Sequence, residues 1–128
     1  MNRVRPPTAA AIRAYRRSHY VAPGLDVRIG SRPRGWPLPG ASIVLLGACN
    51  PSGRRLPTGL NAKRMSRLET CLDSFPHLCG EGRLGRWSEA LFAVAMPLRR
   101  ACVLARRFGQ NAVVALTPDH VARLVWLI

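Results

Sequence analysis

The order of apolar runs and amphipathic segments constrains the fold of this chain more than any other feature. Three continuous apolar runs occupy residues 42–49, 90–96 and 112–116. Uninterrupted apolar runs of this length are typical of strands that are buried on both faces of a sheet. Asn50-Pro51 ends the first run with residues that favour turns. The sequence therefore predicts three buried strands.

Two amphipathic segments separate these strands. The first predicts a helix from about residue 59 to residue 74, with Thr58 as its N-cap. The apolar residues on one face of this helix are Met65, Leu68, Leu72 and Phe75. The second helix is expected to follow Pro97 and to stop at Gly109, because glycine readily takes the left-handed conformation that ends helices.

A further short strand, expected within 77–87, completes the order β-α-β-β-α-β from residue 42 onward. This is the order of the ferredoxin-like split βαβ fold, an antiparallel sheet with two helices on one face. Strands near 25–30 and 121–128 are expected to extend or cap the sheet edges, and 31–40 is expected to be a loop.

The chain is predicted to be one α+β domain. Its 128 residues, 48% of them hydrophobic, suffice for a single core. Residues 1–6 are predicted to form a disordered tail, and residues 7–128 the domain. The domain is expected to begin with a short helix over 8–20, capped by Thr8, with Tyr15 facing inward.

The charge is strongly positive, with 20 Lys and Arg against 6 Asp and Glu, for a net charge of +14. Such an excess favours RNA, DNA or an acidic protein as a partner. The preference for Arg over Lys is also what a GC-rich genome produces. The candidate polyanion-binding residues are Arg13, Arg16, Arg17, Arg54, Arg55, Arg99, Arg100, Arg106 and Arg107.

The cysteine spacing favours no metal centre. Cys49, Cys71, Cys79 and Cys102 form no CxxC pair, and the grouping of Cys71, His77 and Cys79 follows no recognised zinc pattern. We predict small buried thiols, no metal and no cofactor. The sequence also contains no secretory signal and no apolar run approaching the length of a membrane span, which predicts a cytoplasmic protein.

Four motifs carry a family resemblance: "ACNPSGRRL" (48–56), "LNAKR" (60–64), "RWSEALF" (86–92) and "LARRFGQNAVV" (104–114). In order and spacing they resemble the bacterial family known as domain of unknown function 3293, over about residues 42–116. That family has no established activity, so the resemblance implies a set of positions and no function. The matching residues are Asn50, Pro51, Asn61, Arg64, Trp87, Glu89, Phe108, Gly109, Gln110 and Asn111.

Three positions depart from the family pattern. Leu60 replaces a Glu, Pro57 replaces the Ser three residues before it, and Leu91 replaces a Ser. The family's Ser-x-x-Glu has the form of a capping box, and Thr58 can take over the cap here. If that Glu is catalytic elsewhere in the family, this chain lacks the activity.

The polar positions of these motifs form the candidate ligand-binding site, which consists of Asn50, Asn61, Arg64, Trp87, Glu89, Gln110 and Asn111. The structural alternative is that Asn61 bridges loops, that Arg64 pairs with Glu89, and that Trp87 lies at the edge of the core. The Gln110 amide is expected to bond to Asn50, Asn61 or the loop between them. No residue is assigned as catalytic, because the sequence contains no nucleophile elbow and no paired carboxylates.

Three functions are compatible with these features. The leading hypothesis is a non-enzymatic module that binds nucleic acid or another polyanion through arginine. The second is a site for a small molecule or phosphate, with or without catalysis, at Asn50, Asn61, Arg64, Glu89 and Gln110. The third is an accessory subunit that docks on an acidic protein. The sequence alone does not decide between them.

Overall fold

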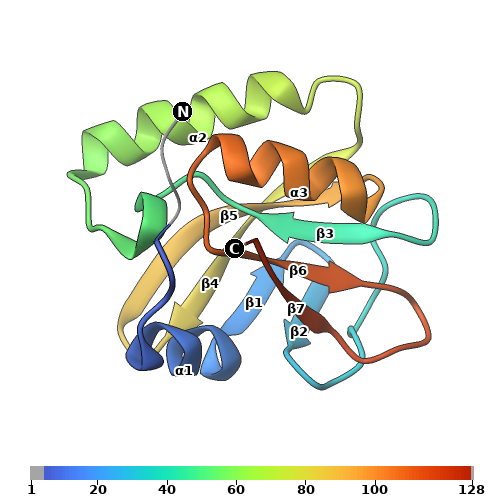
Figure 1. The fold of residues 1–128 in the computed structure, drawn as a ribbon. Helices are drawn as coiled ribbons and strands as arrows, with labels where there is room; N and C mark the ends of the chain where they lie inside the picture. Colours follow the sequence, from blue (N-terminus) through green and yellow to red (C-terminus); the bar gives the residue numbers. More distant parts are fainter. Residues whose placement is uncertain (1–4, 128) are drawn as a thin grey trace.

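A computed structural model describes residues 5–127 of the chain (Figure 1). The helices are α1 (Ala9–Arg17), α2 (Thr58–Cys71) and α3 (Leu98–Arg107), and a 3₁₀ turn, η1, spans Pro51–Gly53. The strands are β1 (His19–Ala22), β2 (Leu25–Arg28), β3 (Ile43–Leu46), β4 (His77–Leu84), β5 (Trp87–Ala95), β6 (Ala112–Leu116) and β7 (Arg123–Trp126).

Within residues 5–127, the seven strands form one antiparallel sheet in the order β2-β1-β4-β5-β3-β6-β7. The sheet curls until its two edges approach each other. The N–H of Gly30, after β2, donates to the carbonyl of Ala122, before β7, at 3.0 Å, and the N–H of Ala122 donates to the carbonyl of Ser31 at 2.8 Å. The predicted α+β class is therefore confirmed, and the expected outer strands lie at the two edges.

The centre of the sheet is buried on both faces, which explains the continuous apolar runs. Alternate residues of a strand point to opposite faces. Val44 and Leu46 of β3 pack in a cluster with residues of α2 and α3, whereas Ile43 and Leu45 pack in a second cluster with residues of β1 and β2. Both long helices thus cover one face, and the curled sheet encloses the other (Figure 1).

The helix α2 presents the predicted apolar face to the core. Leu68 and Leu72 are fully buried, and Met65 and Phe75 pack against the same cluster. The predicted N-cap of α2 is wrong, since Thr58 is the first helical residue and no side chain caps the helix. Pro57 occupies the cap position because its fixed φ suits the extended conformation required there.

The stop of α3 agrees with the prediction. Phe108 is the C-cap, and Gly109 follows with φ +68°, in the left-handed region. A Cβ at this glycine would lie 2.9 Å from the Cβ of Pro51. Gly109 therefore both ends the helix and allows the loop around η1 to approach it closely.

The N-terminal prediction is correct at its start and wrong at its end. The hydroxyl of Thr8 accepts a hydrogen bond from the N–H of Ala11 at 3.1 Å, as expected of an N-cap. The helix ends at Arg17, however, and residues 19–22 form β1. Tyr20 pairs with both β2 and β4 and is buried, so sheet pairing overrides the helical pattern.

Two other expectations need correction, and part of a third lies outside the described residues. The short strand and glycine-rich turn expected over 77–87 are instead the β4–β5 hairpin, paired from His77↔Val94 to Leu84↔Trp87. Cys71 and Cys79 are exposed, not buried. Residues 1–4 of the predicted tail and Ile128 of the predicted last strand lie outside the described residues.

Within the described residues, no helix has both the length and the hydropathy needed to cross a bilayer. The cytoplasmic location, the disordered tail and the single domain remain predictions.

Candidate functional site

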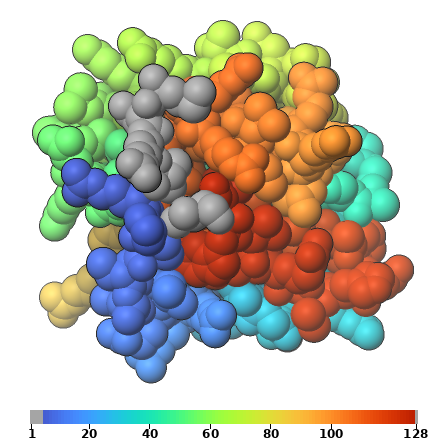
Figure 2. All heavy atoms as spheres, viewed as in Figure 1, coloured from blue at the N-terminus to red at the C-terminus, as the bar shows by residue number. Residues whose placement is uncertain are grey.

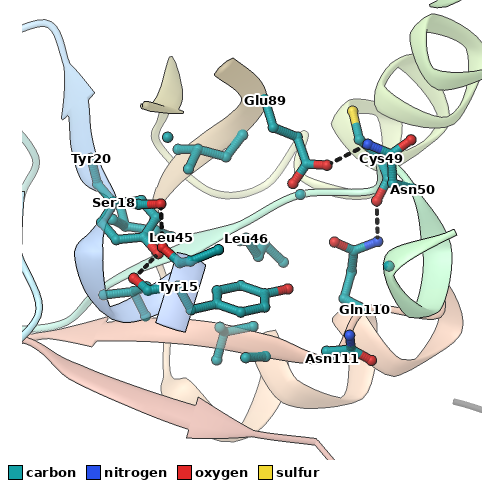
Figure 3. A pocket seen from close by; sticks show the side chains of 18 of the residues that line it. Tyr15, Ser18, Tyr20, Leu45, Leu46, Cys49, Asn50, Glu89, Gln110 and Asn111 are labelled. Atoms are coloured by element: carbon teal, nitrogen blue, oxygen red, sulfur yellow. Dashed lines mark hydrogen bonds between the residues drawn. The ribbon is translucent and has the colours of Figure 1, made fainter. Parts of the chain in front are cut away.

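A cavity of about 320 Å³ lies where α1, the end of β3 and the starts of β5 and β6 meet (Figure 3). This volume is in the range of small-molecule sites. We refer to the cavity as the Glu89 pocket. Its polar lining residues are Tyr15, Ser18, Tyr20, Cys49, Asn50, Arg55, Trp87, Glu89, Gln110 and Asn111.

Asn50 organises one wall of the Glu89 pocket. Its backbone is in the left-handed region, with φ 47° and ψ 63°, a conformation that Asn tolerates better than most residues. Its Oδ1 accepts hydrogen bonds from the Leu56 N–H and the Asn61 Nδ2, each at 2.9 Å. Its Nδ2 donates to Glu89 Oε1 at 2.7 Å. Asn50 therefore joins the loop, α2 and β5 at a single side chain.

Asn61 forms a second hydrogen bond with Asn50, in which the Asn61 Oδ1 accepts from the backbone N–H of Asn50 at 3.0 Å. The two amides thus hold each other in a fixed orientation. Asn61 does not line the cavity. It bridges the loop to α2, as the structural alternative predicted, and so supports the pocket wall from behind.

Arg64 is also a supporting residue. Its Nε donates to the carbonyl of Ala48 at 2.6 Å, its Nη2 donates to the carbonyl of Phe108, and its guanidinium lies 5.9 Å from the centre of the Phe108 ring. Burial lowers the pKa of Arg64. In the described part of the chain Arg64 forms no ion pair with Glu89, whose partner is Asn50.

Gln110 links the start of β6 to the end of β3. Its Nε2 donates to the carbonyl of Cys49 at 3.0 Å and to that of Phe108 at 3.2 Å. The predicted partner was Asn50, Asn61 or the loop between them, so the prediction is wrong by one residue. The actual acceptor, Cys49, directly precedes that segment, and Figure 3 shows the Gln110 amide oxygen on the opposite side, toward Tyr15.

Glu89 lies in the pocket wall with its carboxylate directed at Asn50 (Figure 3). Burial raises the pKa of Glu89, and the hydrogen bond from Asn50 opposes that shift. Burial first and the Glu89 charge second raise the pKa of the Cys49 thiol to about 11. Burial also raises the pKa of Tyr20 to about 12, with a smaller contribution from Glu89. These groups therefore share one electrostatic environment.

Sequence reasoning did not assign Tyr15, Tyr20 or Cys49 to the site. The Tyr20 hydroxyl donates to the carbonyl of Tyr15 at 2.8 Å, and the Tyr15 ring meets the Trp126 ring edge-on, with centroids 5.5 Å apart. Figure 2 shows α1 as a ridge beside the loop that follows β3 and the C-terminal strands. The inward-facing Tyr15 was the available signal, but its helix lies outside the family-like motifs.

The structure brings five of the seven predicted ligand-binding residues to one cavity. Trp87 is 46% exposed, Gln110 is 6% exposed, and Asn111 is 3% exposed. The Oδ1 of Asn111 is the buried side-chain oxygen that finds no hydrogen-bond partner within residues 5–127. The lining residues from the predicted set are Asn50, Trp87, Glu89, Gln110 and Asn111.

The nine candidate polyanion-binding arginines are all exposed. They lie in three places: on α1, in the loop between η1 and α2, and on α3. Arg100 lies over the Phe75 ring at 5.3 Å, and Arg106 donates to the carbonyl of Leu127 at 3.3 Å. Among residues 5–127 the arginine that forms an ion pair is Arg83, with Glu81, so none of the nine is neutralised by an acid.

No three His, Cys, Asp or Glu side chains of the described residues gather as metal ligands. A family model described as "Protein of unknown function (DUF3293)" matches residues 46–113. The predicted family resemblance is thereby confirmed. Neither the curated proteins nor the solved structures contain a match to this chain.

Proposed function

The chain belongs to the DUF3293 family, whose description names no activity, and we propose that its Glu89 pocket binds a small polar molecule. The observation that carries this proposal is the convergence of five family-matched residues on one cavity. Asn61 and Arg64, also family-matched, hold the loops that form its walls. The family motifs thus contribute to both the lining of the pocket and its support, and α1 and β1 contribute the rest of the polar lining.

A phosphate ligand fits the pocket less well than a neutral or positively charged one. The cavity contains a carboxylate, Glu89, whereas the guanidinium of Arg64 is engaged by two backbone carbonyls outside the lining. An anion entering the pocket would meet Glu89 at short range and lose its own hydration. The small-molecule form of the hypothesis is therefore favoured over the phosphate form.

We propose binding without covalent catalysis. Cys49 is the thiol in the pocket wall, and its raised pKa keeps it protonated at neutral pH, when only a thiolate is an effective nucleophile. The remaining polar groups, mainly amides and phenols, position ligands more readily than they form bonds with them.

Ala14→Phe is expected to abolish ligand binding, because Ala14 lines the cavity from α1 and a phenyl group would fill it. Ala10→Phe, on the same helix and exposed, is the matched control. The measurement is a fragment screen by protein-observed NMR. Shifts that cluster at Glu89 and Gln110 in the parent and in Ala10→Phe, but vanish in Ala14→Phe, would support the proposal. A complete lack of shifts with every fragment at millimolar concentration would refute it.

We propose as a second function that the surface binds a polyanion, nucleic acid in the first instance, through the nine exposed arginines. The specific observation in favour is that all nine lack an acidic partner among the described residues. Arginine suits bidentate contacts to phosphate, and such contacts depend little on base sequence.

Binding of single-stranded RNA is expected to weaken steeply with salt. Replacing Arg13, Arg16 and Arg17 of α1 by Gln should make the slope of log affinity against log salt less steep by about 2, or roughly 0.7 for each lost phosphate contact. A triple Gln variant at Arg28, Arg86 and Arg123, exposed arginines outside the candidate set, is the control for net charge. Equal slopes in the two variants would contradict a defined binding surface on α1.

We also propose that the segment from β3 to β6 is a ferredoxin-like split βαβ unit. In support, its strands lie in the order β4-β5-β3-β6 with antiparallel neighbours, and residues of α2 and α3 belong to one hydrophobic cluster. In this description β1, β2 and β7 are additions that curl the sheet, and α1 closes the pocket that they help to form.

A further inference from the structure

We propose that the ligand of the Glu89 pocket is an organic cation that carries N–H donors, an ammonium or a guanidinium group. This inference rests on the proposed small-molecule function and names its ligand class. It follows from the charges that line the cavity, the acceptors that remain free, and the aromatic rings around them.

The pocket lacks the large positive excess of the whole molecule, because the charges of its lining residues sum to zero. The chain carries a net charge of +14, yet among residues 5–127 the cavity wall contains one acid, Glu89, and one basic residue, Arg55. Arg55 is exposed, so solvent screens its charge, whereas Glu89 lies deeper in the wall. A ligand inside the cavity therefore experiences mainly the carboxylate.

Two acceptors of the lining form no hydrogen bond within residues 5–127: the second carboxylate oxygen of Glu89 and the amide oxygen of Gln110. The Nδ2 of Asn50 and the Nε2 of Gln110 are both engaged, by Glu89 and by backbone carbonyls. One carboxylate oxygen of Glu89 accepts from Asn50, and Figure 3 shows the other, like the Gln110 amide oxygen, on the cavity side. A group with several N–H donors can bond to both oxygens at once.

Aromatic rings complete the environment. Tyr15 and Tyr20 line the cavity, and Trp87 lies at its mouth. The faces of such rings attract ammonium and guanidinium groups, most strongly where water is excluded. A carboxylate among aromatic rings is thus suited to a cation, because both contacts act on the same charge.

The desolvation of Glu89 points in the same direction. Burial raises the pKa of this carboxylate, which means that the protein groups around it, including the Asn50 amide, do not fully compensate its ionised form. A cation bound beside it would provide that compensation. Arg55, the basic residue of the described lining, is too exposed to do so.

The inference is tested with four probes of similar size: n-butylammonium, methylguanidinium, n-butanol and butyrate. NMR titration of the parent protein at neutral pH should give shifts at Glu89 and Gln110 with the two cations, and binding at least 10-fold weaker for the alcohol and the acid. Glu89→Gln should weaken cation binding by about 10- to 100-fold, as expected for loss of a charge-assisted hydrogen bond. Arg55→Gln, which removes the competing positive charge, should strengthen it.

The outcomes separate this inference from the proposal on which it rests. Preferred binding of butyrate, or loss of binding in Arg55→Gln, would overturn the cation assignment but leave a small-molecule pocket. Preferred binding of the alcohol, with Glu89→Gln unchanged, would do the same. If none of the four probes binds and the wider fragment screen also finds no ligand, the small-molecule function itself fails. The probe series needs only the parent protein, so the test does not depend on variants that fold.

Discussion

Arg64→Ala is expected to lower the free energy of unfolding by about 3 kcal/mol, through the loss of hydrogen bonds to the carbonyls of Ala48 and Phe108. The first of these carbonyls belongs to a fully buried residue, so water cannot easily replace the guanidinium. The side chain connects α2 to the ends of β3 and α3 and thereby holds the pocket walls. Urea unfolding followed by tryptophan fluorescence measures the change.

Arg67→Ala is the matched control, because Arg67 lies on the same helix and is exposed. Its loss should change stability by no more than about 0.5 kcal/mol. Arg64→Lys keeps the charge but has no planar fork to donate to two separate carbonyls, so it should recover only part of the loss. Equal stability of the Arg64→Ala and Arg67→Ala variants would show that the two carbonyl bonds do not stabilise the fold.

Patterns that extend over several turns or a whole buried strand predicted the fold well. The strand at 112–116 agrees residue for residue with β6, and the apolar face of α2 packs as expected. Local patterns failed where sheet pairing decides the structure. Residues 19 and 20 were predicted to end the first helix, but they belong to β1. This strand is fixed by pairing with β2, which follows it, and with β4, which is distant in the sequence.

The curl of the sheet could not be predicted for the same reason. It depends on the contact between Ile29 and Ala122, which are far apart in the chain and carry no pairing signal. The length of the β4–β5 hairpin was hidden by glycines. Gly80 lies so close to the carbonyl of Val21, 2.4 Å from where a Cβ would be, that the strand needs a glycine there, and the pattern resembles a loop.

The site was predicted as a set of positions but not as an arrangement. Asn50, Glu89 and Gln110 do line one cavity, whereas Asn61 and Arg64 stand behind its wall. A motif cannot distinguish a residue that lines a cavity from one that supports the cavity wall, since both are polar and both lie at the ends of helices or strands. The structure makes that distinction, because it shows which side chains line the cavity and which ones bond only to the loops behind it.

The amides at the junction of α3 and β6 illustrate the point. The side chain of Gln110, at the start of β6, bonds to the carbonyl of Cys49, which follows the end of β3. The N–H of Ser52 donates to the carbonyl of Gly109 at 2.7 Å, so backbone and side-chain bonds connect the same two loops. Figure 3 shows the Gln110 amide oxygen on the cavity side, so the side chain that joins the two loops also lines the pocket.

Asn50→Asp is expected to make the stability strongly dependent on pH. The substitution keeps the acceptor for Leu56 and Asn61 but replaces the donor to Glu89 by a carboxylate, at a position where the original contact measures 2.7 Å. Two carboxylates at that distance cannot both ionise freely, so the pKa of the pair rises above its value in the unfolded chain. Protonation of the pair restores a hydrogen bond, and ionisation removes it.

The sign follows from this raised pKa. An acid whose pKa is higher in the folded state binds more protons when folded, so stability falls as the pH rises past the unfolded value of about 4. Asn50→Asp should therefore approach the parent in stability near pH 4 and fall about 3 kcal/mol below it near pH 8. The parent carries a smaller loss of the same sign, because burial already raises the pKa of Glu89. Urea unfolding at several pH values measures both curves.

The double variant Asn50→Asp with Glu89→Gln separates this electrostatic effect from a general loss of packing. It exchanges donor and acceptor across the same contact, since the introduced amide can donate to the introduced carboxylate. We expect most of the stability at pH 8 to return, with a coupling between the two changes of about 2 kcal/mol. If the double variant kept the pH dependence of the single one, the Asn50–Glu89 bond would not be its origin. The repulsion would then have to come from another group near the loop. Glu89 would no longer be the main source of negative charge in the pocket.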